Sequence, residues 1–156
     1  MKSIFKTNAT KASVRVNTNS LMMGSLFFIL TLIWSLNPLK FSPVVIVQIV
    51  LAIPLLFVST LAYSKLGYSE DTRTWDALGW FTNNVGSIFI LNVVGLMTAM
   101  YFHVIAIMYF VLIVLLMGLY STINVFHRPE QSTEKVLKFI FFVAILLAGG
   151  ILPLAF

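Results

Sequence analysis

Apolar residues occur along this chain in long runs that short polar segments interrupt. The longest run, residues 77–126, spans 50 residues with one histidine and no formally charged side chain. As one helix it would be roughly 75 Å long, more than twice the thickness of the hydrocarbon core of a bilayer, so it must fold back on itself. Aromatic residues favour the membrane interface, and Tyr101 and Phe102 therefore place the turn near residues 99–103.

The complete pattern predicts five transmembrane helices. Their expected bounds are about 21–36, 43–63, 77–98, 104–126 and 136–154. Residues 1–20 form a polar basic segment before this bundle, and residues 21–156 form a single transmembrane bundle. Composition supports this assignment, because 60% hydrophobic residues, 10% charged residues and a mean hydropathy of +0.99 are not those of a soluble domain. The fold class is an all-α integral membrane protein with a five-transmembrane-helix bundle.

The first run is the weakest span, and a signal peptide is its main competitor. Asn37, Pro38, Leu39 and Lys40 follow it in place of a small-residue cleavage site, so we expect an uncleaved helix. A mitochondrial presequence is an alternative, since the leader has no acid, but Arg15 is its one arginine.

Basic residues determine the expected orientation, because cytoplasmic flanks accumulate lysine and arginine. With five spans, Lys40 alone lies on one side, and the other nine basic residues share the opposite side: Lys2, Lys6, Lys11, Arg15, Lys65, Arg73, Arg128, Lys135 and Lys138. With four spans the division would be five against five. The sequence therefore predicts the amino terminus inside and the carboxyl terminus outside.

The charge distribution also indicates the partners. The chain has a net charge of +5, and its basic residues lie beside apolar spans. Anionic lipids of the inner leaflet are nearer partners for them there than nucleic acid. We expect contacts with the lipid bilayer and with other membrane subunits or itself, and no nucleic acid. The expected location is a bacterial or archaeal cytoplasmic membrane, with an organelle membrane as the alternative.

The third predicted span carries an unusual polar face. Asn84, Ser87, Asn92, Gly95 and Thr98 lie within about 140° of one another on a helix. Amides are costly to bury unpaired in hydrocarbon, so this face must meet another helix, another subunit or water. It either packs against helices or lines a hydrated path, for which the possible facing residues are Gln48, Thr60 and Asn124. In the last span Ala144, Ala148 and Gly149 predict close helix packing.

Chemical motifs are few. The chain has no cysteine, and His103 and His127 are expected a membrane thickness apart, so we predict no metal site, no cofactor and no enzyme activity. The alternative is an acid and histidine site in the inner loops, formed by His127, Glu130, Glu70 and Asp71. Asp76 is interpreted as the cap of the third helix.

These observations favour a non-enzymatic subunit or assembly component of a membrane complex or homo-oligomer. The alternative is a small oligomeric channel or facilitator for a neutral solute or ion, which would use the polar face of the third span.

Overall fold

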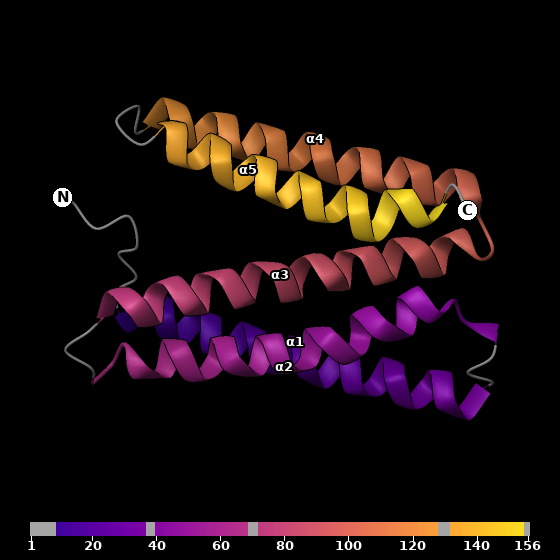
Figure 1. The fold of residues 1–156 in the computed structure, drawn as a ribbon, viewed down its shortest axis with the longest axis horizontal. Coiled ribbons are helices and arrows are strands. Elements are labelled where there is room, and N and C mark those ends of the chain that lie inside the picture. The colour runs from indigo at the N-terminus through magenta and orange to yellow at the C-terminus, as the bar shows by residue number, and fades with distance from the viewer. Residues whose placement is uncertain (1–8, 37–39, 69–71, 128–131, 155–156) are drawn as a thin grey trace. The chain divides into compact units, whose positions relative to one another are not determined.

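The computed structural model describes residues 9–36, 40–68, 72–127 and 132–154. Within these ranges it contains five long helices (Figure 1): α1 (Ala9–Leu36), α2 (Pro43–Lys65), α3 (Thr72–Ala99), α4 (His103–His127) and α5 (Ser132–Leu146). A π-helical turn, η3 (Leu147–Ile151), and a 3-10 turn, η4 (Leu152–Leu154), extend α5. With this extension, all five are long and apolar enough to cross a membrane. The predicted all-helical membrane class is confirmed, whereas the orientation stays a prediction.

Helix α1 begins twelve residues before the predicted span, so much of the basic segment is helical; residues 1–8 of that segment lie outside the described residues. The hydrophobic pattern marks where a helix enters the hydrocarbon core, not where the helix begins. The polar part of α1 satisfies its hydroxyl groups within the helix, as where the Ser20 hydroxyl donates to a backbone carbonyl oxygen one turn earlier. At about 1.5 Å per residue, the 28 residues of α1 extend about 42 Å, beyond the hydrocarbon core.

The interpretation of Asp76 as a helix cap is wrong. Helix α3 begins at Thr72, and Asp76 is therefore the fifth residue of the helix rather than the residue before it. Its side chain is 2% exposed. The polar residues from Thr72 onward continue the helix because they include no helix-breaking proline or glycine before Gly79.

The chain divides into two compact units, Met1–Ile90 and Leu91–Phe156, and α3 contributes to both. In the first unit α1 packs along α2, and apolar side chains including Leu26, Ile33 and Ile49 are buried. Helix α3 joins this core where Gly86 lies against Leu56 and Ala52 of α2. The single bundle predicted for residues 21–156 stays a prediction.

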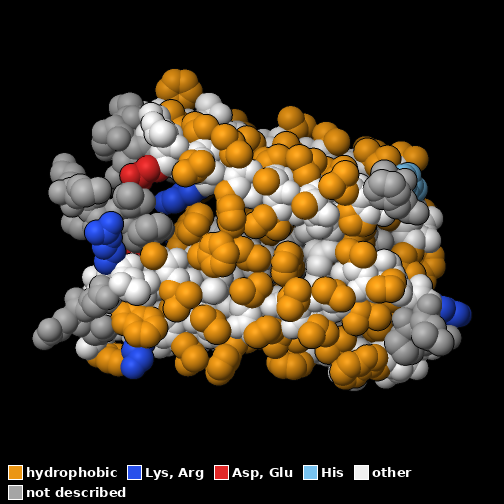
Figure 2. Space-filling model, in the orientation of Figure 1, with side chains coloured by type: hydrophobic (Ala, Val, Ile, Leu, Met, Phe, Trp, Pro, Cys, Tyr) orange, Lys and Arg blue, Asp and Glu red, His pale blue; other side chains and the backbone are white. Residues whose placement is uncertain are grey.

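The second unit is a compact arrangement of the end of α3 with α4 and α5. Hydrogen bonds from the backbone amides of Tyr101 and Phe102 to the carbonyl oxygen of Thr98 close the turn between α3 and α4, where the sequence predicts it. Helix α5 and η3 pack on α4, and Phe110 is buried at 1% exposure. Figure 2 shows hydrophobic side chains spread over the face that it draws, with charged side chains near helix ends.

Candidate functional site

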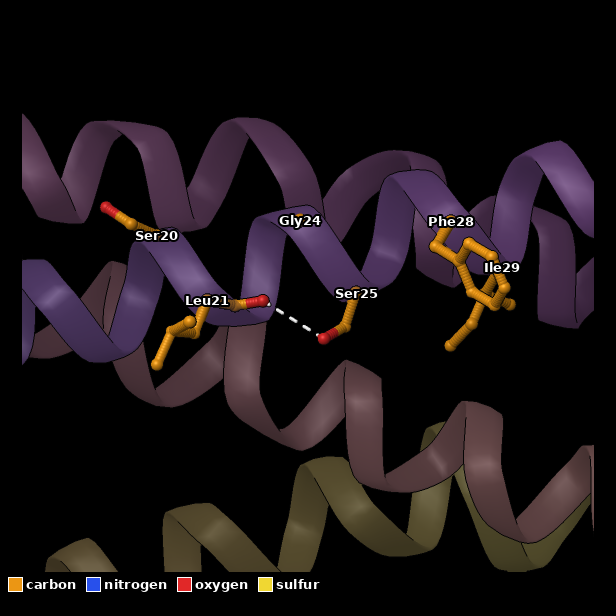
Figure 3. Close-up of a pocket in the computed structure, with 6 residues that line it drawn as sticks. All are labelled: Ser20, Leu21, Gly24, Ser25, Phe28 and Ile29. Atoms are coloured by element: carbon orange, nitrogen blue, oxygen red, sulfur yellow. Dashed lines mark hydrogen bonds between the residues drawn. The ribbon is translucent and has the colours of Figure 1, made fainter.

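The outer surface of α1 has an open groove of about 560 Å³ (Figure 3). It is lined by Ser20, Leu21, Gly24, Ser25, Phe28 and Ile29. Gly24 leaves the surface hollow, because a Cβ atom added there would have no other atom within 4 Å. The Ser25 hydroxyl donates to the Leu21 carbonyl oxygen at 3.0 Å, so this polar group is satisfied without a partner from another helix.

This groove belongs to a longer stripe along α1. Within about 80° of one another around the helix axis lie Thr10, Ser13, Asn17, Ser20, Gly24, Phe28, Thr31 and Ser35, all of them exposed. All but one are small or polar. The buried residues Asn19, Leu26 and Ile33 lie on the opposite side of the helix. Helix α1 therefore presents to its own unit a mainly apolar face that also carries Asn19, and it presents outward a row of residues that, apart from Phe28, are small or polar.

A chain of polar groups joins the three helices of the first unit. The Asn19 side-chain amide donates to the Ser59 hydroxyl at 3.0 Å, and that hydroxyl donates to the Gly79 carbonyl oxygen at 3.0 Å. Both side chains are completely buried. The side-chain oxygen of Asn19 has no hydrogen-bond partner among the described residues. This network fixes α1 and α3 against α2 at the level of Ser59.

Arg15 and Tyr63 form a second polar contact between α1 and α2. The guanidinium donates to the tyrosine hydroxyl, and its central carbon lies 4.9 Å from the centre of the tyrosine ring. Tyr63 is 1% exposed, whereas its position in the sequence suggests an anchor at the membrane interface. Gly79 makes this burial possible, since its Cα faces the ring and a Cβ there would be 3.0 Å from it.

The predicted polar face of the third span is shared between the two units. Asn84 and Ser87 belong to the first: the Asn84 amide donates to the Trp80 carbonyl oxygen at 2.6 Å, and the Ser87 hydroxyl lies 3.9 Å from the sulfur of Met22. Asn92, Gly95 and Thr98 belong to the second. Thr98 donates to the Val94 carbonyl oxygen of its own helix at 2.8 Å.

Asn92 and Gly95 are packing positions in the second unit. Gly95 lies against Phe110, because a Cβ at Gly95 would be 2.3 Å from the ring. Asn92 is completely buried, and neither polar atom of its side chain has a partner within the described residues. Its oxygen faces Gly150 of η3, at 2.5 Å from the position of a Cβ there. Asn92 and Gly95 thus contact other residues of the second unit, and the choice between packing and a hydrated path stays a prediction.

The three possible facing residues belong to different units, Gln48 and Thr60 to the first and Asn124 to the second, and their facing the polar stripe stays a prediction. Gln48 is buried in α2. Thr60, also in α2, donates to the Leu56 carbonyl oxygen at 2.9 Å. Asn124 belongs to the second unit. Its side-chain amide donates to the backbone carbonyl oxygen of Tyr120, and its backbone carbonyl oxygen accepts a hydrogen bond from the Lys135 ammonium.

The residues predicted to pack in the last span differ in their surroundings. Ala144 and Ala148 are exposed, and Gly149 is half-buried in η3. The neighbouring Gly150 makes the close contact instead, with the side chains of Asn92 and Phe110.

His103 and His127 are exposed at opposite ends of α4, and the described residues contain no group of three or more metal-ligating His, Cys, Asp or Glu side chains.

Replacing Ser59 with alanine tests the network in the first unit. The variant leaves the buried Asn19 amide without its acceptor, which should lower the free energy of unfolding by about 1–3 kcal/mol. Unfolding in mixed detergent micelles measures this change. Adding Asn19→Leu should recover part of the loss, whereas Ser64→Ala, at an exposed position whose hydroxyl bonds to Thr60, should have little effect. Equal losses in the Ser59 and Ser64 variants would contradict the assignment.

Sequence reasoning did not identify Arg15, Asn19 and Ser59 as connected residues. Arg15 was assigned to a polar flank, and a single buried serine in an apolar span has no distinctive pattern. The available signal was that Arg15 and Asn19 are polar residues four positions apart, which places both on one face of a helix.

Comparison of the chain with protein-family models, curated proteins and solved structures gave no match.

Proposed function

We propose that this chain is a non-enzymatic membrane protein that works by assembly, as a subunit or accessory component of a membrane complex or as a homo-oligomer. The observation that carries the proposal is the outward face of α1. A helix with the length and hydropathy of a membrane span exposes a row of residues that, apart from Phe28, are small or polar, and this row is hollowed at Gly24.

The chemistry of this face suits another helix better than lipid. Lipid tails are as apolar as leucine, so helices associate in membranes by close packing and by hydrogen bonds between helices, which small residues permit. Ser20 and Gly24 are separated by three residues and form a small-xxx-small pair, beside which Asn17 adds an exposed amide. We infer that a transmembrane helix of a second subunit packs along this pair.

The setting of this assembly follows from the charge distribution. We propose that the amino terminus of α1 is cytoplasmic, in a bacterial or archaeal cytoplasmic membrane. The bilayer then contacts the exposed apolar residues of α4, such as Leu112 and Leu115, which carry no groups that could recognise a partner by polar contacts.

The experiment compares two substitutions at Gly24. Leucine fills the groove and should weaken association at least about tenfold, while alanine should retain most of it. Neither disturbs the described fold, because the position has open space around it. Mass measurement of the complex extracted in polymer nanodiscs, with its co-purifying chains identified, gives the assembly state.

Ala148→Leu provides the matched comparison, since Ala148 is a small exposed residue in the last span and part of the other predicted packing pair. Association that is lost in the Ala148 variant and kept in the Gly24→Leu variant would assign the contact to the last span. A chain that stays monomeric in its native membrane would contradict the proposal itself.

A further inference from the structure

The two sides of α1 repeat with the same period. On the side that packs along α2, every seventh residue is buried: Ala12, Asn19, Leu26 and Ile33. On the opposite side every seventh residue is exposed: Thr10, Asn17, Gly24 and Thr31. A repeat of seven follows a shallow left-handed path along a helix of 3.6 residues per turn, and a second helix follows this path when it crosses at about +20°. Helix α1 therefore has two rows suited to a neighbouring helix, and α2 occupies one of them.

A second series of exposed residues alternates with the first on the outer side. It repeats every seven residues as well and consists of Ser13, Ser20, Phe27 and Trp34. Together the two series, here called the outer row, offer a contact every three or four residues, which is the spacing found where two helices pack side by side. Fluid lipid chains impose no such period on the residues that face them. The hollow at Gly24 lies one turn from Phe27, so it has space for an aromatic ring from a partner at the same level.

Asn17 gives the outer row a hydrogen-bonding group that the helix does not satisfy. Neighbouring hydroxyl groups donate to carbonyl oxygens of their own helix, from Ser20 to Val16 and from Thr31 to Phe27. The Asn17 amide makes no hydrogen bond to another residue that the structure describes. An amide carries both donors and an acceptor, so two asparagines that face each other satisfy one another. A single asparagine in such a row also fixes the register of a parallel helix pair.

The charges of α1 leave the outer row free to meet its own copy. The helix has no acid, and its described bases, Lys11 and Arg15, lie about 140° and 180° from the middle of the row. Lys2 and Lys6 lie outside the described residues. Pairs of different helices are commonly selected by opposite charges beside the contact, and the described residues that flank this row carry no charge. Copies of one chain cross the membrane in the same direction, so their α1 helices run parallel.

We infer that the partner is a second copy of this chain, whose α1 packs in parallel along the outer row about a twofold axis. In a twofold contact each residue of the row meets its counterpart. Asn17 then bonds to the partner's Asn17, and Phe27 of each copy enters the hollow at Gly24 of the other. The inference rests on the proposed function, because it names the subunit that packs along α1.

Disulfide crosslinking tests this contact in the native membrane, since the chain has no cysteine of its own. Ser20→Cys and Thr31→Cys place a thiol in the outer row. The matched controls are Ser25→Cys and Thr18→Cys, at exposed positions of α1 about 100–120° from the middle of the row. Oxidation with copper phenanthroline should join two copies at least about tenfold faster in the row variants, because a disulfide needs Cα atoms within about 7 Å. Non-reducing electrophoresis measures the crosslinked dimer.

A second variant tests the asparagine pair. Asn17→Leu in the Ser20→Cys chain should slow crosslinking roughly threefold, the effect of losing one hydrogen bond between membrane helices, while Asn17→Gln should retain more of the rate. Equal crosslinking in the row and control variants would show random collision and overturn the inference. A complex that holds one copy of the chain with a foreign subunit would support the proposed function and overturn the second copy, whereas a monomer would overturn both.

Discussion

Gly95→Ala should lower the free energy of unfolding by about 1–3 kcal/mol, the usual cost of inserting a methyl group into a filled core. The new Cβ would lie 2.3 and 2.5 Å from two atoms of the Phe110 ring. Phe110 is 1% exposed, and its edge-to-face partner Tyr109 lies 5.5 Å away between ring centres, so the ring has little freedom to move aside. Unfolding of the purified protein in mixed micelles measures the effect.

Two further variants separate this contact from a general effect of alanine. Gly118→Ala, in α4 of the same unit, should be neutral or slightly stabilising, because the nearest atom of Phe139 would be 3.8 Å from the new Cβ. Phe110→Leu removes the tip of the ring and should make Gly95→Ala less costly, giving a coupling free energy of about 0.5–3 kcal/mol in a double-mutant cycle. Additive losses would show that Gly95 and Phe110 do not meet.

Asn92→Leu should raise the free energy of unfolding by about 1–3 kcal/mol, although it removes a completely buried polar side chain of the second unit. Burying an amide without hydrogen bonds costs about this much, and leucine has a similar size without the polar atoms. Neither the side-chain oxygen nor the side-chain nitrogen of Asn92 has a partner within the described residues. The same unfolding assay measures the gain.

The control for Asn92→Leu is Asn84→Leu, which removes an amide that bonds to the Trp80 carbonyl oxygen and should give a smaller change. The pair also tests the alternative function. If the face of the third span lined a channel, the double variant would block solute flux in liposomes while the protein still folded. A loss of stability in Asn92→Leu would mean that its amide has a partner, such as water, and would reopen the channel interpretation.

The sequence alone predicted the turn between α3 and α4 and the count of apolar spans well. Both depend on the length of apolar runs relative to the bilayer and on aromatic residues at its surface, such as Tyr101 and Phe102. The start of α1 was missed because its first three turns are mostly polar, and hydropathy does not distinguish a polar helix from a polar loop. The same limit explains the wrong assignment of Asp76.

The polar face of the third span shows a different limit. The helical period correctly indicates that Asn92 and Gly95 lie near one face of α3. It does not indicate which residue of another helix stands opposite, and the contact with Phe110 depends on how α4 is rotated about its own axis. The groove on α1 was missed for a related reason. Small residues such as Ser20 and Gly24 leave an open groove only where no other helix covers them, and the sequence does not show which face of α1 is covered.

The sequence by itself thus determined that the protein is helical, that it belongs in a membrane and where its apolar spans lie, because these properties depend on local composition and on the thickness of the bilayer. The tertiary structure decided which side chains meet: Arg15 with Tyr63, Asn19 with Ser59, and Gly95 with Phe110. These contacts require particular rotations and separations of neighbouring helices, which follow from the packing of all their side chains together and are not encoded in the period of any one helix.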